Sequence, residues 1–324
     1  MALIFVTRKI PEIGLRWMKE GGHEVVVSEK DGALSPDELK EMLSLRPYEG
    51  IVSLLTDHID GSVLSFTPQL KIVANYAVGF NNIDVSALGQ ARVTVTNTPD
   101  VLTDTVAEYT VSLILSVVKR IPEADRFMRA KKYQGWSPEL LLGSDLTGKT
   151  LGIVGAGRIG SAVAKRLSLG FGMQVNYYDI NRSESLESEI GCHYYETPED
   201  VLRTSDVVSL HVPLLPETKH FLSAERLAMM KPSAYLINTS RGGVIDEKAL
   251  VEALKKGIIK GAGLDVFESE PKLARGLSKL ENVVLTPHIA SASEETRNKM
   301  SEMVAVNINE FFLGHIPPNI VSFQ

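Results

Sequence analysis

Short apolar runs alternate with helix-period segments along the chain, and this alternation limits the fold more than any other feature of the sequence. A run of four to eight apolar residues is typical of a buried strand, whereas apolar residues three or four positions apart indicate a helix with one buried face. Strands that alternate with helices form parallel sheets, because the chain must return to the same end of the sheet. We therefore expect an α/β fold.

The pattern falls into two series, which suits a chain of 324 residues with about two domains. The first series predicts strands at 2–6, 24–27, 50–55, 71–74 and 93–96, with a capped helix starting at Ser35. The second predicts six strands, at 150–154, 174–178, 206–212, 235–238, 261–266 and 283–285. Helices are expected at 103–119, 122–132, 159–169, 184–190, 223–230, 247–256 and 293–313. The last of these follows the second series and should pack on the first domain.

Composition excludes several classes of protein. With 44% hydrophobic and 23% charged residues the chain is typical of globular proteins, and its one cysteine, Cys192, permits no internal disulfide. The net charge of -6, without a long basic cluster, argues against nucleic acid as a partner. The longest apolar stretch, residues 111–118, is too short to span a membrane. We expect a cytoplasmic protein with no membrane partner and no bound metal.

A glycine-rich motif lies between an expected strand and an expected helix. Gly155-Ala156-Gly157-Arg158-Ile159-Gly160 has the form GxGxxG and follows the strand 150–154. In this context Gly155 permits a tight turn, Gly157 lets a pyrophosphate approach the backbone, and Gly160 allows close helix packing. Asp179 ends the next strand, where a carboxylate accepts hydrogen bonds from ribose hydroxyls. The motif predicts a dinucleotide site.

Two residues bear on the choice of cofactor. A carboxylate at Asp179 would repel the additional phosphate of NADP, so NAD(H) is favoured. Arg182, three residues further on, could instead accept that phosphate, which leaves NADP(H) as the alternative.

Polar residues that follow the later strands provide the groups for carbonyl chemistry. Arg241 follows the strand 235–238, Asp265, Glu268 and Glu270 follow 261–266, and His288 follows 283–285. Ligands bind at this end of the strands in open α/β sheets. His211 competes with His288 on position alone, while the other histidines, His23 included, are expected at the surface or in turns. A turn at 77–82 carries backbone amides that could hold a carboxylate.

These segments together resemble the D-isomer-specific 2-hydroxyacid dehydrogenases, most closely their glyoxylate/hydroxypyruvate reductase branch. The resemblance covers nearly the whole chain, although residues 273–277 depart from the His-Pro-Leu of many relatives. It rests on Asn75-Tyr76-Ala77-Val78-Gly79, Asn97-Thr98-Pro99-Asp100-Val101-Leu102-Thr103, the GxGxxG motif with Asp179, His211-Val212-Pro213-Leu214-Leu215-Pro216-Glu217-Thr218, Asn238-Thr239-Ser240-Arg241-Gly242-Gly243, Gly263-Leu264-Asp265-Val266-Phe267 with Glu270-Pro271, and Pro287-His288-Ile289-Ala290-Ser291-Ala292.

The resemblance implies a role for each candidate residue. His288 would be the general acid, Glu270 would hydrogen-bond it and raise its pKa, and Arg241 would bind the substrate carboxylate and polarise the carbonyl. The amides of Val78 and Gly79 would hold the other carboxylate oxygen. In the cofactor site, Asp265 would orient the nicotinamide carboxamide, Pro213, Thr239 and Ala290 would line the cleft, and Arg158 and Ile159 would contact the pyrophosphate.

The family architecture implies two Rossmann-like or flavodoxin-like domains with the active site in the cleft between them. Residues 1–98 with 289–324 would form the substrate domain and 99–288 the NAD-binding domain. The helix from Thr103, with the arm through Trp136, resembles a dimerisation element, so a homodimer is expected. The implied activity is NAD(P)H-dependent reduction of glyoxylate or hydroxypyruvate. The alternatives are a 2-ketogluconate, D-lactate or phosphite dehydrogenase, and a non-enzymatic NAD-sensing protein like the family's corepressors.

Overall fold

The computed structural model describes residues 1–321 and divides the chain into two compact units. Unit 1 contains Met1–Leu102 and the chain from Ala292 on, and unit 2 contains Thr103–Ser291. The chain therefore passes between units after residues 102 and 291, where the sequence led us to expect 98 and 288. Residues 322–324 of the expected substrate domain lie outside the described residues.

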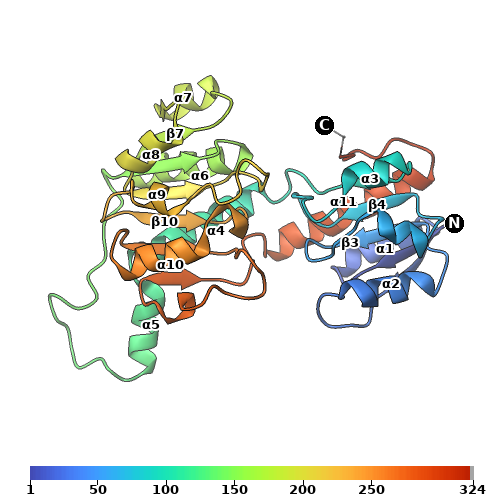
Figure 1. The fold of residues 1–324 in the computed structure, drawn as a ribbon, viewed down its shortest axis with the longest axis horizontal. Coiled ribbons are helices and arrows are strands. Elements are labelled where there is room, and N and C mark those ends of the chain that lie inside the picture. The colour runs from blue at the N-terminus through green and yellow to red at the C-terminus, as the bar shows by residue number, and fades with distance from the viewer. Residues whose placement is uncertain (322–324) are drawn as a thin grey trace. The chain divides into compact units, whose positions relative to one another are not determined.

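Unit 1 is built on a parallel sheet (Figure 1), which within residues 1–321 has five strands in the order β2-β1-β3-β4-β5. This order is that of flavodoxin-like folds, with the reversal of direction between β1 and β3. Each strand begins or ends within a few residues of its predicted position. The strands are β1 (Leu3–Val6), β2 (Glu24–Val27), β3 (Gly50–Ser53), β4 (Ile72–Asn75) and β5 (Thr94–Thr96).

The helices of unit 1 cover both faces of this sheet (Figure 1). The predicted cap at Ser35 is present, because its side chain accepts from the Glu38 amide and the Glu38 side chain accepts from the Ser35 amide. The long last helix packs on unit 1 as expected, and a Cβ at Gly14 would lie 2.2 Å from the Ser301 carbonyl oxygen. The helices are α1 (Glu12–Glu20), α2 (Pro36–Ser44), α3 (Val85–Gln90), α11 (Glu294–Phe312) and the 3-10 helix η1 (Gly61–Ser65).

Unit 2 is built on a second parallel sheet, whose order within the described chain is β12-β11-β10-β9-β6-β7-β8. We predicted six strands here and the sheet has seven in residues 1–321, because β8 has only two residues and leaves no periodic pattern. The strands are β6 (Thr150–Val154), β7 (Gln174–Tyr178), β8 (His193–Tyr194), β9 (Val207–Leu210), β10 (Tyr235–Asn238), β11 (Gly261–Leu264) and β12 (Val283–Leu285).

Helices pack on both faces of the second sheet, so unit 2 has the doubly wound arrangement of Rossmann folds. One apolar core joins α4 and α6 to the sheet, and the other joins α8, α9 and α10 to it. Within residues 1–321 no helix is long and apolar enough to cross a membrane. The helices are α4 (Thr103–Val118), α5 (Ile121–Arg129), α6 (Arg158–Phe171), α7 (Glu184–Ile190), α8 (Pro198–Thr204), α9 (Ala224–Leu227), α10 (Glu247–Lys255), η2 (Gly242–Val244) and η3 (Leu277–Lys279).

His23 is not the surface histidine that we expected. Its side chain is buried beside Phe312, with ring centroids 5.2 Å apart, and neither ring nitrogen has a hydrogen-bond partner among residues 1–321. Burial and the positive amino terminus lower the pKa of His23, and the negative charge of Glu49 opposes them. A proton on His23 therefore binds more readily to the unfolded chain than to the folded one.

We expect this histidine to make the protein less stable in mild acid. Below about pH 6.5 the unfolded chain binds a proton at His23, whereas the folded chain does not. The free energy of unfolding therefore decreases as the pH falls below that value. Between about pH 7.5 and about pH 5, the free energy of unfolding should decrease less in His23→Phe than in the parent chain. Denaturant titrations at both pH values measure the difference. Identical pH dependence in the two proteins would contradict the assignment.

Candidate active site

The glycine-rich turn follows β6, at the point where the strand order of the second sheet reverses. From β6 the chain proceeds to β7 and β8 on one side, and β9 to β12 lie on the other. Such a reversal opens a crevice at the carboxyl ends of the strands, where ligands bind. Gly155 has φ of +96°, and a Cβ there would lie 2.8 Å from the His211 carbonyl carbon. Glycine is therefore required at this position by its conformation and by the neighbouring strand.

The other two glycines of the motif have different neighbours. A Cβ at Gly160 would lie 2.0 Å from the Gly155 carbonyl oxygen, so this glycine lets the helix pack against the turn. At Gly157, by contrast, no atom of residues 1–321 lies within 4 Å of an added Cβ. Gly157 is the N-cap of α6, and no side chain caps this helix end. The open space before the N–H groups of the helix fits a pyrophosphate.

Asp179 lies at the end of β7, next to the glycine-rich turn. Its carboxylate accepts one hydrogen bond from the Ala156 amide at 2.7 Å and one from the Asn181 amide at 3.0 Å. Because each carboxylate oxygen has two lone pairs, Asp179 can still accept hydrogen bonds from a ribose. The residues around the turn therefore fit a dinucleotide. Arg158 and Ile159 are the first two residues of α6 and lie beside Gly157.

Arg182 is held in an ion pair within unit 2. Its Nε and Nη2 donate to the two carboxylate oxygens of Glu187, at 2.9 and 2.7 Å. The bonds from Arg182 and from Tyr177 lower the pKa of Glu187 to about 2, so the pair is ionised across the neutral range. The charge that could have attracted a 2′-phosphate is thus partly neutralised by Glu187.

Asp265 follows β11 and organises the loop that carries His288. Its Oδ1 accepts from the Thr286 hydroxyl at 2.7 Å and the Ile289 amide at 2.9 Å, and its Oδ2 accepts from the Ala290 amide at 2.8 Å. The His288 amide donates to the Asp265 carbonyl oxygen at 2.8 Å. These bonds hold the backbone of His288 at φ of +55°, a conformation that residues other than glycine rarely adopt.

His288 and Glu270 form the hydrogen bond that the resemblance implied. Nδ1 of His288 lies 2.9 Å from Oε2 of Glu270, and Oε1 of Glu270 accepts from the Phe267 amide at 3.0 Å. Although burial opposes ionisation of Glu270, the bond to His288, its charge and the Phe267 amide together lower the pKa of this carboxyl. With Nδ1 bonded to Glu270, Nε2 is the ring atom that remains for a substrate.

Arg241 follows β10, in a loop shaped by a buried asparagine. Nδ2 of Asn238 donates to the Arg241 carbonyl oxygen at 2.9 Å, and its Oδ1 accepts from the amide and hydroxyl of Ser240. Burial lowers the pKa of Arg241, and the negative charge of Glu270 opposes this shift, so the two groups lie within electrostatic reach. An arginine remains charged in either case. A Cβ at Gly242 would lie 1.9 Å from the Phe267 carbonyl carbon, so the two loops pack tightly.

Glu247 was not among the expected site residues, although it holds the loop that contains Glu270. It is the first residue of α10, is buried, and accepts from the Glu268 amide at 2.7 Å. Burial raises the pKa of Glu247, and the amides of Glu268 and Ala274 oppose the shift. Both ends of the segment 268–274 are thus tied to one carboxyl group. An acidic residue in a first helical turn is so common that no sequence pattern marks Glu247 for this role.

His211, the competitor for His288, has a different environment. Its Nε2 bonds to the Ser209 hydroxyl at 2.8 Å instead of to a carboxylate. Burial lowers the pKa of His211 to about 4, so the ring is neutral at neutral pH. A neutral histidine cannot start the reaction as a cationic proton donor. The geometry therefore favours His288 as the acid.

The remaining expected cofactor residues lie at the same edge of the second sheet. Pro213 follows β9 and is exposed, and Thr239 follows β10 with its hydroxyl 2.9 Å from that of Thr110. Ala290 is buried in the loop after β12. Because all these strands are parallel, their carboxyl ends share one edge with the glycine-rich turn. Val78 and Gly79 belong to unit 1, where they follow β4.

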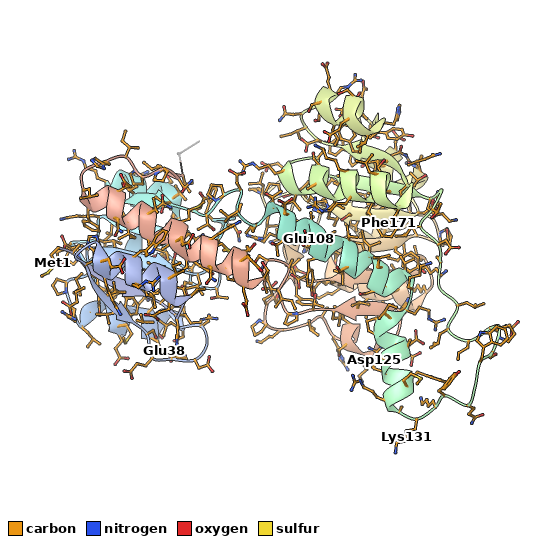
Figure 2. The ribbon with its side chains drawn as sticks, turned by 180° about the vertical axis from the view of Figure 1, so that it is seen from behind. Met1, Glu38, Glu108, Asp125, Lys131 and Phe171 are labelled. Carbon is orange, nitrogen blue, oxygen red and sulfur yellow. The ribbon has the colours of Figure 1, made fainter. Side chains whose placement is uncertain are left out.

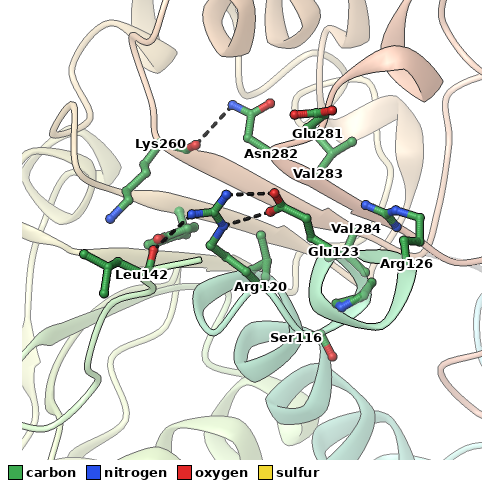
Figure 3. Close-up of a pocket in the computed structure, with 13 residues that line it drawn as sticks. Ser116, Arg120, Glu123, Arg126, Leu142, Lys260, Glu281, Asn282, Val283 and Val284 are labelled. Carbon is green, nitrogen blue, oxygen red and sulfur yellow. Dashed lines mark hydrogen bonds and ion pairs between the residues drawn. The ribbon is translucent and has the colours of Figure 1, made fainter. Parts of the chain in front are cut away.

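A depression at the opposite edge of the second sheet is a separate feature (Figure 3). It is lined by residues from the amino ends of β10, β11 and β12, together with α4, α5 and Leu142. Arg120 and Glu123, at the start of α5, form a bidentate ion pair in its lining, both bonds being 2.8 Å. These two charges satisfy each other, and the carboxyl-edge residues described above do not line this depression.

Comparison with known proteins identifies the family. Residues 111–290 match the family model described as "D-isomer specific 2-hydroxyacid dehydrogenase, NAD binding domain". This segment is more than half of the chain and contains the glycine-rich turn, Arg241, Glu270 and His288. The chain belongs to the D-isomer specific 2-hydroxyacid dehydrogenase family, and the resemblance seen in its sequence is confirmed.

Individual relatives extend the match to the whole chain. The glyoxylate reductase of Korarchaeum cryptofilum is 51% identical over 322 residues, which are 98% of this chain and 95% of that protein. The glyoxylate reductase of Thermococcus litoralis is 48% identical, covering 98% of this chain and 96% of that protein. Among solved structures, the NADPH-dependent glyoxylate/hydroxypyruvate reductase of Sinorhizobium meliloti, in complex with NADP and malonate, has a TM-score of 0.86 and 35% identity, covering 99% of this chain and 97% of that one.

Proposed function

We propose that the protein reduces glyoxylate or hydroxypyruvate to the 2-hydroxy acid, glycolate or D-glycerate, with a nicotinamide cofactor. The observation that carries this proposal is the His288–Glu270 hydrogen bond with Arg241 nearby, at the same sheet edge as the glycine-rich turn. A proton donor and a cation are the two groups that reduction of a 2-oxoacid requires from the protein. The names of the relatives support the same substrates.

The reaction depends on three side chains. The bound nicotinamide supplies the hydride. Nε2 of His288 donates its proton to the carbonyl oxygen of the substrate, so negative charge does not accumulate there. Glu270 bonds to Nδ1 and so orients the ring, with Nε2 left for the substrate. Arg241 pairs with the substrate carboxylate and polarises the carbonyl.

We infer that NADH is the preferred cofactor and NADPH the weaker one. The carboxylate of Asp179 stands where an adenosine ribose would bind, and the charge of Arg182 is shared with Glu187. Both features disfavour a 2′-phosphate. In support of the alternative, the relative from Sinorhizobium meliloti is described as NADPH-dependent. A cytoplasmic location belongs to this proposal as well, since the one cysteine of the chain is buried and burial raises its pKa to about 11.

The test is an absorbance assay of NADH and, separately, NADPH oxidation. Glyoxylate, hydroxypyruvate, pyruvate and 2-ketogluconate are offered as substrates, and phosphite is offered with the oxidised cofactors. We expect rapid turnover of NADH with glyoxylate or hydroxypyruvate. Turnover only with another substrate would replace the proposed reaction by that one. Tight NADH binding without turnover of any compound would favour the NAD-sensing alternative.

Arg241→Ala should act mainly on substrate binding. A charged hydrogen-bonded pair contributes about 1.5–3 kcal/mol, so we expect KM for glyoxylate to rise about 10- to 100-fold, with the Kd for NADH unchanged. Arg203→Ala is the control, because it removes an exposed arginine of unit 2 that pairs with Asp200. Steady-state kinetics and fluorescence titration with NADH give the two constants. An unchanged KM in Arg241→Ala would reject the role of this arginine.

We further infer that the protein is a homodimer assembled through α5 and the arm after it. No residue of α5 is buried, and the helix with its arm projects from the second sheet, as the positions of Asp125 and Lys131 show (Figure 2). A projecting surface with this many exposed apolar side chains indicates an interface. The side chains are those of Ile121, Met128, Tyr133, Trp136, Leu140 and Leu142.

Charge placed on this surface should dissociate the dimer. Ile121 and Met128 are each 56% exposed, so the double substitution Ile121→Glu/Met128→Glu should be tolerated by the folded monomer. Light scattering should then give half the mass of the parent protein. Leu169→Glu, at an exposed leucine of α6, is the control and should leave the mass unchanged. An unaltered dimer in the double variant would place the interface elsewhere.

A further inference from the structure

The backbone after β4 has its carbonyl groups fixed one after another. The Ala77 carbonyl oxygen accepts from the Thr98 amide at 2.9 Å. The next, that of Val78, accepts from the side-chain amide of Asn97 at 2.8 Å. The third, that of Gly79, accepts from the side-chain amide of Asn75 at 2.9 Å. Three successive peptide groups are thus bonded to residues at the ends of β4 and β5.

These bonds also fix the directions of three N–H groups. In a trans peptide the N–H points opposite to the C=O of the same group. The amides of Val78, Gly79 and Phe80 therefore point away from the groups that hold the three carbonyls. None of the three donates to another group of residues 1–321, and none of these residues is buried. Successive N–H groups that face one space form an anion site.

The two asparagines are themselves held firmly. Asn75 is a fully buried residue of β4, and its Oδ1 accepts from the Ser53 hydroxyl at 3.1 Å. The Asn97 amide donates to the Asn319 carbonyl oxygen at 3.2 Å, and the Asn97 carbonyl oxygen accepts from the Asn307 side chain at 3.3 Å. Their side-chain amides can therefore orient the peptides without the freedom of a surface residue.

We propose that Asn75 and Asn97 are positioning residues, which hold the amides of Phe80 and Gly79 beside that of Val78 as a preformed site for the substrate carboxylate. Each of the two side-chain donors holds one carbonyl oxygen of the loop, so its removal frees that peptide group to rotate. The proposal rests on the proposed function for the identity of the anion. It predicts that the asparagines affect carboxylate affinity and leave the chemical step and the cofactor unaffected.

The experiment compares Asn97→Ala and Asn97→Asp with Asn309→Ala. Asn97→Asp keeps the shape of the side chain and loses the donor that faces the Val78 carbonyl oxygen. Asn309→Ala is the matched control, because it also removes one side-chain amide bonded to a backbone carbonyl in unit 1, that of Trp17 at 3.1 Å. The measured quantities are KM and kcat for glyoxylate, the Kd for NADH, and the Kd for oxalate, a dicarboxylate without a reducible carbonyl, in the presence of NADH.

Both Asn97 variants should raise KM for glyoxylate and Kd for oxalate in parallel, by about tenfold, with kcat and the Kd for NADH near those of the parent. Asn309→Ala should change none of the four. If the parent and the Asn97 variants bind oxalate equally well, the positioning role is wrong, whatever the reaction. The parent could reduce neither glyoxylate nor hydroxypyruvate while the Asn97 variants still lose affinity for oxalate. In that case the proposed reaction is wrong and the proposed anion site is supported. Equal losses in kcat and affinity would also overturn the proposal.

Discussion

Replacing His288 by glutamine is expected to lower kcat for glyoxylate reduction by about 10²- to 10⁴-fold, the range that general acid catalysis contributes. Glutamine keeps a polar side chain of similar length and cannot deliver a proton as imidazolium does. The glycine-rich turn is separate from this side chain, so the Kd for NADH should stay within about twofold. Single-turnover kinetics with NADH, together with a fluorescence titration, measure both quantities.

His211→Gln is the matched control for this experiment, because His211 is the other histidine at the carboxyl edge of the second sheet that could donate a proton. Its ring is neutral and bonded to Ser209, so we expect kcat to change far less than in His288→Gln. The reverse order of effects would move the acid to His211. Glu270→Gln should fall between the two, since an amide oxygen can still accept a bond from Nδ1 but the ring loses its anionic partner.

Gly157→Val should weaken NADH binding by about 100-fold or more, with a loss of stability of about 1 kcal/mol or less from the poorer N-cap. Apart from its chain neighbours, no atom of residues 1–321 lies within 4 Å of a Cβ added here, so the start of the new side chain meets no obstacle. The side chain would instead occupy the space before the helix N-terminus, where a pyrophosphate would accept charged hydrogen bonds of about 1.5–3 kcal/mol each. Fluorescence titration gives the affinity, and thermal unfolding without cofactor gives the stability.

Two other glycines of α6 serve as controls. Gly170→Ala also meets no atom within 4 Å in the described chain and lies at the far end of the helix, so both affinity and stability should be retained or slightly improved. Gly160→Ala, whose Cβ would collide with the Gly155 carbonyl oxygen, should lose about 1–3 kcal/mol of stability. Unchanged NADH affinity in Gly157→Val would refute the dinucleotide site at this turn.

Much of the fold could be predicted from local patterns, because the period of apolar residues reports directly on which face of an element is buried. The strands 150–154, 174–178, 235–238 and 283–285 were predicted with the bounds that the structure has. The elements that were not predicted include β8, which has two residues, and α8, which has seven. α1 was also missed, although its nine residues bury one face.

The sequence by itself determined the α/β class, the two parallel sheets and the position of the glycine-rich turn, since each follows from residues that are neighbours in the chain. It also supplied Arg241, Glu270 and His288 as candidates. Only the tertiary structure shows that the His288 ring bonds to Glu270, 18 residues away on another loop, whereas the His211 ring bonds to the nearby Ser209 hydroxyl. The same holds for the contacts of Asn75, Asn97 and Glu247. Asn97 and Glu247 bond to backbone groups 19 and 21 residues away, and Asn75 bonds to the Gly79 carbonyl across a turn, and the period of apolar residues reports none of these contacts.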